Sequence, residues 1–364
     1  MARYLFVIAR LNLGGTSQYL HQLSKGLIAG GDEVLIATGS VQGAEREDPL
    51  VASMPIRRIG SLGRKISPLN DWRARRELRL LIAEYKPDLI YSHTFKAGLL
   101  ARTIRTSTPR VHAFHGHLLS EPELAGWRSR VVVVIERWLA ERACVLVTVG
   151  SKVSRELLAE RVGSPSQYRS IAPGVVPLAL ADRELVRREF GIEGETRPVV
   201  IWLARVTAVK APHRVVELAR QIPEAFFVLA GGGDLLSELE RSSVANLKVV
   251  GWQEAAKMWA IADLAISTSE NEGMPVALIE AQLAGVPVVG IDVGSVREVV
   301  ANGATGYVLG EFGSEYVARV RELVGDAKLR AKFASAARER ATVEFSPERL
   351  LNSHREMFAE ILAR

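Results

Sequence analysis

Two glutamates, Glu272 and Glu280, stand on either side of a short segment that contains glycine and proline. An apolar run precedes Glu272, and Pro275 suits the first turn of a helix, where its missing N–H is not needed. The sequence thus predicts Glu272 on a loop after a strand and Glu280 inside the next helix. A ligand with phosphates and hydroxyls would fit the carboxylates and the free N–H groups of this helix start. The alternative is an ordinary capped helix with Glu272 near the positive end of its dipole. The free N–H groups would be those of Gly273, Met274, Val276 and Ala277.

Two cations follow another predicted strand, residues 198–203. Arg205 offers a planar fork of donors and Lys210 a point charge, and two such groups on one loop can hold a diphosphate. An exposed basic loop is the alternative. Near the N-terminus, Gly14 and Gly15 would let a ligand approach the backbone closely, although a tight turn also needs glycine.

Three histidines lie in the segment 112–117, at the end of the predicted strand 110–114. Metal binding has to be considered, but His112 and His115 would point to opposite faces of a strand, and no acid or cysteine lies nearby. His115 is therefore the candidate for a hydrogen bond to a substrate hydroxyl or for stabilising charge. His93, at another strand end, is a similar but weaker candidate.

The 364 residues, 48% hydrophobic and 24% charged, suffice for two domains of ordinary size. The single cysteine, Cys144, is expected to be a buried strand residue in a protein of a reducing compartment, the cytoplasm. Residues 1–9 predict a first strand and not a signal peptide, and no apolar run approaches membrane-spanning length. The net charge of +6 permits anionic partners such as nucleotides or an acidic membrane surface.

Strands and helices alternate along both halves of the chain, which predicts an α/β fold of parallel sheets covered by helices. Thr16 is expected to cap the first helix, and residues 173–177 are expected to link two doubly wound domains that face each other across a cleft. Gly231 to Asp234 lacks the spacing of a dinucleotide-binding fingerprint. We expect an N-terminal domain over 1–174, a C-terminal domain over 175–345, and a last helix over 346–364 that packs back on the N-terminal domain.

Two surfaces could matter for a partner. The first is a basic cluster, and the second is a basic amphipathic surface that could contact an anionic membrane or a lipid pyrophosphate; each could instead be an ordinary solvated helix face or core. No module for nucleic-acid binding is evident. The first surface is Arg64, Lys65, Arg73, Arg75, Arg76 and Arg79. The second is Leu118, Leu119, Trp127, Val131 to Ile135 and Trp138, interleaved with Arg128, Arg130 and Arg137.

The run from Ser269 to Val289 resembles the signature of the retaining glycosyltransferases of family 4, which have the two-domain GT-B fold. The resemblance extends over the chain and includes Gly14–Gly15, the pair Arg205 and Lys210, and His115 before Gly116. The segments 92–100 and 114–117 are similar to the bacterial members that build capsular, O-antigen or other lipid-linked glycans.

The resemblance implies a nucleotide-sugar donor, with UDP as our guess for the nucleotide, and a hydroxyl of a glycan or lipid-linked acceptor. It implies transfer with retention and without a metal or other cofactor, and it allows peripheral contact with the inner membrane surface. Arg205 and Lys210 would hold the diphosphate, Glu280 the ribose, and Glu272 with Gly273, Met274 and Pro275 the donor sugar. His115 would contact the sugar from the other domain, and Gly14 and Gly15 would approach the donor phosphates.

Two departures from the family pattern concern the loops around the donor. Ala211 and Pro212 follow Lys210 where the family usually has glycine, and residues 293–298 keep Gly294 and Glu298 but lack a second glycine and a proline. Three other functions remain: a nucleotide-sugar 2-epimerase of the same fold, a non-catalytic protein that binds a nucleotide sugar, and a nicotinamide dehydrogenase. The two glutamates disfavour the epimerase. The intact pair Arg205 and Lys210 disfavours the non-catalytic binding protein, and the missing dinucleotide-binding fingerprint disfavours the dehydrogenase.

Overall fold

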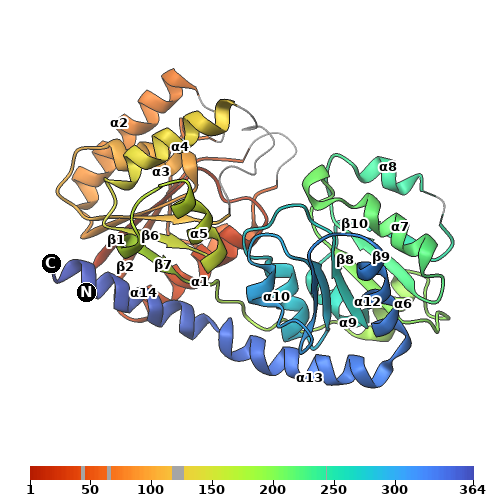
Figure 1. The fold of residues 1–364 in the computed structure, drawn as a ribbon. Coiled ribbons are helices and arrows are strands. Elements are labelled where there is room, and N and C mark those ends of the chain that lie inside the picture. The colour runs from red at the N-terminus through yellow and green to blue at the C-terminus, as the bar shows by residue number, and fades with distance from the viewer. Residues whose placement is uncertain (42–45, 64–66, 117–126, 243) are drawn as a thin grey trace. The chain divides into compact units, whose positions relative to one another are not determined.

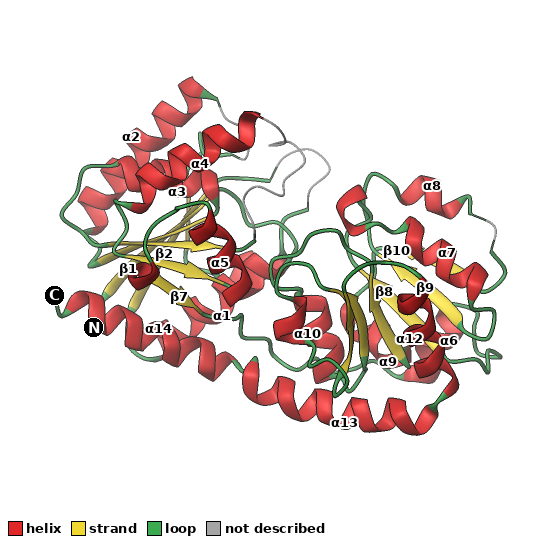
Figure 2. Ribbon diagram, in the orientation of Figure 1, coloured by secondary structure: helices red, strands yellow, loops and turns green. Residues whose placement is uncertain are grey.

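The computed structural model describes residues 1–41, 46–63, 67–116, 127–242 and 244–364 (Figure 1). The chain divides into two compact units. Unit 1 comprises Met1–Val175 together with Ser346–Arg364, and unit 2 comprises Val176–Phe345. Each unit is a parallel sheet with helices on its faces (Figure 2), so the prediction of an α/β fold with two doubly wound sheets is confirmed.

Unit 1 contains a seven-stranded parallel sheet in the order β3-β2-β1-β4-β5-β6-β7. Its strands are β1 Arg3–Ile8, β2 Glu33–Thr38, β3 Ile56–Arg58, β4 Leu89–His93, β5 Arg110–Phe114, β6 Val145–Thr148 and β7 Tyr168–Ser170. Its helices are α1 Gly15–Ala29, η1 Pro49–Ser53, α2 Pro68–Tyr85, α3 Phe95–Thr103, α4 Trp127–Ala140, α5 Ser151–Ala159, η4 Pro165–Gln167 and α14 Pro347–Leu362.

The central strand β1 is apolar on both faces, as expected for a parallel strand covered by helices on each side. Leu5 and Val7 belong to the core beneath α2 and α3, whereas Phe6 and Ile8 belong to the core shared with α1 and α14. Because successive side chains of a strand point to opposite faces, one short apolar run supports both helix layers.

The last helix, α14, belongs to unit 1. Ser346 caps it, since its hydroxyl accepts a hydrogen bond from the N–H of Arg349 at 3.2 Å. Met357 and Phe358 are buried in the core of unit 1, and α14 contacts α1.

Unit 2 contains a six-stranded parallel sheet in the order β10-β9-β8-β11-β12-β13. Its strands are β8 Val199–Leu203, β9 Phe226–Ala230, β10 Leu247–Gly251, β11 Leu264–Ser267, β12 Val288–Ile291 and β13 Gly306–Leu309. Its helices are α6 Arg183–Glu189, η5 Ala208–Lys210, α7 His213–Gln221, α8 Leu236–Glu240, α9 Ala255–Ile261, α10 Val276–Leu283, α11 Val296–Val299, α12 Ser314–Gly325 and α13 Ala327–Glu344.

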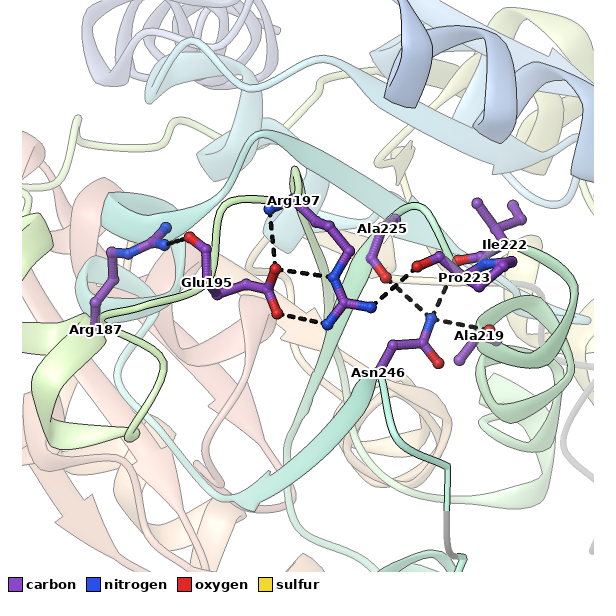
Figure 3. Close-up of polar contacts among 8 residues, drawn as sticks. All are labelled: Arg187, Glu195, Arg197, Ala219, Ile222, Pro223, Ala225 and Asn246. Carbon is purple, nitrogen blue, oxygen red and sulfur yellow. Dashed lines mark hydrogen bonds and ion pairs between the residues drawn. The ribbon is translucent and has the colours of Figure 1, made fainter.

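Polar contacts fix the amino-terminal end of β8 (Figure 3). The guanidinium of Arg197 forms two hydrogen bonds with the carboxylate of Glu195, at 2.8 and 2.5 Å. These hydrogen bonds lower the pKa of Glu195 to about 2. The buried amide of Asn246 donates to three carbonyls around the end of α7, those of Ala219, Ile222 and Ala225. The strand β8, whose carboxyl end carries the candidate site, is thus held in place at its amino-terminal end.

Two local expectations were wrong, and one helix was missed. Cys144 is exposed and precedes β6 instead of being buried within it. The first helix begins at Gly15 and has Gly14 as its N-cap, without a side-chain cap, so Thr16 lies inside the helix. The sequence analysis also missed α6, which begins after the capping residue Asp182.

Candidate active site

In unit 2, the predicted donor-site residues gather at the carboxyl ends of two neighbouring strands. Arg205 and Lys210 follow β8, and Glu272 follows β11. These strands are adjacent in the sheet, and the strand order reverses direction between them. In open parallel sheets this reversal leaves a crevice at the carboxyl edge, where ligands bind.

Lys210 and Glu272 form an ion pair. Nζ of Lys210 lies 2.6 Å from Oε1 of Glu272, and their side chains are 15% and 10% exposed. The hydroxyl of Ser269 donates to the same carboxylate oxygen at 2.7 Å. A lysine ammonium has three donors and a carboxylate accepts several hydrogen bonds. Both groups can therefore bind a ligand while they remain paired.

A buried hydroxyl holds the backbone that carries Lys210. Thr268 lies just after β11, and its Oγ1 is 3.0 Å from the carbonyl oxygen of Lys210 and 3.1 Å from that of Ala211. The same hydroxyl accepts a hydrogen bond from the indole N–H of Trp202 at 2.9 Å. The sequence analysis identified only a strand before Glu272 and missed this role, because nothing local in the sequence signals it.

Ala211, one of the departures from the family pattern, has a left-handed backbone with φ +46° and ψ 54°. This region favours glycine, because a Cβ atom is crowded there. The chain thus keeps the turn after Lys210 at the cost of local strain.

The loop that follows β12 packs against the backbone of Glu272 and Gly273. The N–H of Ser295 donates to the carbonyl of Gly273 at 2.8 Å. Gly294 has φ +51°, and a Cβ atom there would lie 1.7 Å from the carbonyl oxygen of Glu272. Gly294, which the sequence shares with the family pattern, is therefore needed for this close approach.

The start of α10 supplies backbone donors beside Glu272. The N–H groups of Leu278 and Ile279 bond to the carbonyl of Pro275. Those of Gly273, Met274, Val276 and Ala277 have no partner among the residues that the structure describes. Glu280 lies one turn into α10 and is buried, with 7% of its surface exposed. The start of α10 thus carries the unpaired N–H groups that the sequence predicts. That these groups bind an anion stays a prediction.

Arg205 is exposed, and within the described residues its guanidinium forms no ion pair. Its loop lies against the glycine run after β9. A Cβ atom at Gly231 would lie 1.8 Å from the carbonyl oxygen of Ala204, and one at Gly233 would lie 2.2 Å from that of Val206. Two glycines of this run are therefore needed for close packing against the backbone next to Arg205.

In unit 1, the predicted residues also gather at the carboxyl edge of the sheet. Gly14 and Gly15 follow β1, His93 ends the adjacent β4, and His115 follows β5. Gly14 has φ +147°, and a Cβ atom built there meets nothing within 4 Å. There is thus open space beside the backbone of Gly14, just before α1 begins at Gly15.

His93 and His115 are hydrogen-bonded to each other, with Nδ1 of His93 3.0 Å from Nε2 of His115. Nε2 of His93 is buried and has no partner among the described residues. A buried N–H without a partner is more costly than a bare acceptor, so His93 carries its proton on Nδ1 and donates it. His115 must then carry its own proton on Nδ1, where it is a hydrogen-bond donor.

Burial keeps both rings neutral. His115 is partly exposed as a residue, but its ring packs edge-on against Tyr19, with the ring centroids 5.0 Å apart. Burial of the ring, and secondly repulsion by His354 in its protonated form, lower the pKa of His115 to about 4. Burial also lowers the pKa of His93. At neutral pH, His115 is therefore an uncharged ring with an N–H at Nδ1.

His354 connects α14 to the residues that surround His93 and His115. Its Nδ1 lies 2.8 Å from the carbonyl oxygen of Leu350 and must donate to it, so Nε2 is an acceptor. The hydroxyls of Tyr19 and Tyr91 lie 2.9 and 3.2 Å from Nε2. The same two tyrosines pack against His115 and His93, respectively. The sequence analysis did not identify His354, which lies far from the other residues in the chain.

His112 is separate from this pair, since its Nδ1 lies 2.9 Å from the hydroxyl of Ser92 and its ring is fully buried. His117 lies outside the described residues. Among the residues described, no group of three histidine, cysteine or acidic side chains is arranged to hold a metal ion.

Comparison with known proteins assigns a family to this chain. The model of the glycosyl transferase 4-like domain matches residues 14–174, and the model of glycosyl transferases group 1 matches residues 182–340. Between them the two matches extend over most of the chain. The chain therefore belongs to the GT4-type glycosyltransferases, and its two sheets are the two Rossmann-like domains of the GT-B fold.

Curated relatives are distant and longer. The sulfoquinovosyl transferase SQD2 of Arabidopsis thaliana is 24% identical over 274 residues, which is 71% of this chain and 54% of that protein. A D-inositol 3-phosphate glycosyltransferase of Geodermatophilus obscurus is 27% identical over 315 residues, with 74% of this chain and 66% of that protein covered. The chain thus spans between half and two thirds of the length of these relatives.

Solved structures share the fold. Sucrose-phosphate synthase from Thermosynechococcus elongatus superimposes over 100% of both chains with a TM-score of 0.85 and 17% identity. The Anabaena protein HepE in complex with UDP-glucose has a TM-score of 0.80 and 20% identity, with 99% of this chain and 100% of that chain covered.

Proposed function

We propose that the protein transfers a sugar from a UDP-sugar to a hydroxyl group of a glycan or lipid-linked acceptor, with retention of the anomeric configuration and without a divalent metal. The observation that carries the proposal is the arrangement around the Lys210–Glu272 pair. Arg205 stands on the same loop after β8 as Lys210, and free helix-start N–H groups and Glu280 follow Glu272 in the chain, on either side of the point where the strand order of unit 2 reverses. A fold-related protein, HepE, was crystallised with UDP-glucose.

The donor diphosphate would bind to Lys210 and Arg205. When the bond between the sugar C1 and the diphosphate oxygen breaks, its electron pair stays on the diphosphate, whose charge increases. Fixed cations and N–H groups stabilise that charge at no cost of reorganisation, which is the main way in which such sites accelerate a reaction. The acceptor oxygen bonds to C1 on the same face, and its proton passes to the departing phosphate oxygen.

The carboxylates would bind the hydroxyl groups of the donor. Glu272, already oriented by Ser269 and Lys210, accepts from the hydroxyls of the donor sugar. Glu280, one turn further into α10, accepts from the ribose hydroxyls, so the two carboxylates bind opposite ends of one donor. In unit 1, the Nδ1–H of His115 is a neutral donor for a hydroxyl, and Gly14 and Gly15 leave room for a ligand at the backbone.

The test is a panel of UDP-sugars and GDP-sugars, incubated with the full chain in EDTA and with acceptors that include monosaccharides, sugar phosphates and prenyl-linked sugars. We expect acceptor-dependent release of UDP and, by NMR, a product with the donor's anomeric configuration. Release of a free epimer would indicate an epimerase, donor binding without turnover would indicate a binding protein, and loss of activity in EDTA would contradict the metal-independent mechanism.

A matched pair of variants distinguishes the site from the rest of unit 2. Lys210→Ala should lower turnover by roughly 10²- to 10³-fold, the usual effect of removing one charge-stabilising donor. Lys257→Ala removes another lysine of unit 2, which pairs with Glu189 at 2.7 Å on the surface. It should leave turnover unchanged, and equal losses in both variants would rule out the proposed role of Lys210.

A further inference from the structure

Large apolar side chains are exposed on two helices of unit 1. Of the fourteen that stand exposed in the described part of the chain, six lie on α2 and α4. Trp72 on α2 and Val134 on α4 are each 60% exposed. Scattered exposed apolar residues are ordinary, but a concentration on two helices that pack against the same third helix, α3, indicates an interaction surface. The six are Leu69, Trp72, Leu80, Val131, Val134 and Trp138.

On α2, arginines share the exposed side with these apolar residues. Arg73, Arg76 and Arg79 are exposed at helical spacing, on the side where residues three and four apart lie together. The acids of the same stretch have partners elsewhere. Asp71 lies 2.5 Å from Nζ of the buried Lys96, and Glu77 accepts from the hydroxyl of Ser61 at 2.5 Å. Between residues 69 and 80, the exposed side of α2 is therefore apolar and positive.

The exposed side of α4 has the same composition. Arg130 and Arg137 are exposed beside the valines, and the guanidinium of Arg142 lies 3.6 Å from the centroid of the Trp138 ring. The acids nearest to this side are Glu160, 3.9 Å from Arg137, and the exposed Glu141. Arginine over tryptophan is a combination that suits a membrane interface, where the ring contacts apolar groups and the cation contacts phosphates.

Buried contacts fix α2 and α4 relative to each other through α3, which contacts both (Figure 1). Arg102 of α3 bonds to both carboxylate oxygens of Glu136 on α4, at 2.7 and 2.8 Å, and both side chains are fully buried. The guanidinium of Arg75 on α2 donates to the carbonyl of Thr103 at 2.8 Å. We call the exposed sides of α2 and α4 together the α2–α4 face.

We propose that the α2–α4 face docks onto a bilayer surface that contains anionic lipids. Apolar residues that enter the headgroup region, interleaved with arginines that attract lipid phosphates, are the two components of peripheral membrane binding. At the end of α2, Arg79 also lines a hollow of about 340 Å³ together with Lys86 and Arg105, which suits a phosphate headgroup. In the described residues, no helix combines the length and apolarity needed to cross a membrane.

The proposal rests only on residues whose side chains the structure describes. Arg64, Lys65, Leu118 and Leu119, which the sequence analysis grouped with these helices, lie outside the described residues, and the side chains of Trp127 and Arg128 are not described. It does not depend on the proposed transfer reaction, since vesicle binding can be measured without donor or acceptor.

The experiment is co-sedimentation of the full chain with vesicles of phosphatidylcholine alone or with about 30% phosphatidylglycerol. We expect binding to the anionic vesicles only, and weaker binding as the ionic strength rises. Replacing Arg73, Arg76 and Arg79 together by Gln should weaken binding roughly a hundredfold, because each basic side chain near an anionic surface contributes. Val134→Asp should weaken it roughly tenfold or more.

Two matched controls lie in unit 2. Exchange of the exposed Arg220, Arg241 and Lys328 for Gln removes the same charge, and Val343→Asp places a carboxylate at a valine that is 69% exposed. Both controls should bind vesicles like the unaltered protein, and thermal melting should show all four variants folded. The proposal is overturned if anionic and neutral vesicles bind equally, if neither binds, or if the two charge-removing variants lose binding equally. A protein partner that binds this face while vesicles do not would also overturn it.

Discussion

Nζ of Lys210 lies 2.6 Å from Oε1 of Glu272, although the two residues follow different strands. In the absence of a ligand, each group neutralises the other in a site from which most water is excluded. The pair therefore has two roles that mutations can separate. It stabilises unit 2 by mutual neutralisation, and in the proposed reaction it presents a cation to the diphosphate and a carboxylate to the sugar.

Lys210→Met alone should destabilise unit 2 by about 1–3 kcal/mol, since it leaves a largely buried carboxylate without its partner. Adding Glu272→Gln removes the unpaired charge and should restore most of that stability, but not turnover. Urea denaturation and UDP release measure the two effects. Recovery of turnover together with stability would show that the pair is only structural.

Thr268→Val should lower both stability and turnover while Thr268→Ser should retain most of each. The valine removes the acceptor of the Trp202 N–H and the contact to the carbonyls of Lys210 and Ala211. An unsatisfied buried donor costs about 1–3 kcal/mol. If Thr268 positions Lys210, kcat should fall more than the melting temperature alone accounts for, at temperatures where the variant is fully folded. A variant that is less stable but has an unchanged kcat would exclude the positioning role.

Ala211→Gly should leave turnover intact and leave stability equal or up to about 1 kcal/mol higher, because glycine relieves the left-handed strain while it loses more entropy on folding. The matched control is Ala331→Gly, on the exposed side of α13 in the same unit. There the same exchange should cost about 1 kcal/mol, since the backbone is helical. Equal destabilisation of both variants, measured by urea denaturation, would mean that Ala211 is not strained.

The sequence predicted the features that depend on local pattern. Alternating apolar runs located the strands, and Pro275 with the preceding carboxylate located the start of α10 within a residue or two. Ala211 could be identified as unusual from its neighbours in the motif, yet only the backbone shows that alanine adopts the turn that glycine usually makes.

Features that depend on the meeting of distant segments were not predictable. The contact of Lys210 with Glu272, the pairing of His93 with His115, and the arrival of His354 on α14 all require the register and order of strands. Cys144 was misplaced because an apolar run does not show at which residue the strand begins.

The buried ion pair of Arg102 and Glu136 joins α3 to α4. Variants of this pair measure how much it contributes to the stability of unit 1. Burial raises the pKa of Glu136 and lowers that of Arg102, so both charges pay a desolvation cost that their contact offsets. Glu136→Gln should destabilise unit 1 by about 3–5 kcal/mol, because it leaves a buried guanidinium without a counter-charge. The double exchange Arg102→Met with Glu136→Leu should be far less harmful. Denaturation of the three proteins tests this, and a double variant as unstable as the single one would contradict it.

His354 predicts how stability depends on pH. Burial lowers its pKa to about 4 in the folded protein, a shift to which the charge of Arg349 adds and which the hydrogen bond to Leu350 opposes. In the unfolded chain a histidine titrates near 6.5. Between these values, the unfolded state binds a proton that the folded state does not. The free energy of unfolding must therefore fall as the pH falls from about 6.5 to about 4, by up to about 1.4 kcal/mol per pH unit for this one group.

Replacing His354 by Gln removes that titration and retains a side chain that can accept a hydrogen bond from Tyr19 or Tyr91. The variant should be less stable than the unaltered protein at pH 7, but its stability should fall less steeply with acid, by about 1.4 kcal/mol per pH unit over the same range. Urea denaturation at half-unit intervals from pH 7 to pH 4.5 measures the slopes. Because His93, His112 and His115 also have lowered pKa values, acid dependence should persist in the variant. Parallel slopes for the two proteins would mean that His354 takes up its proton in the folded state as readily as in the unfolded chain.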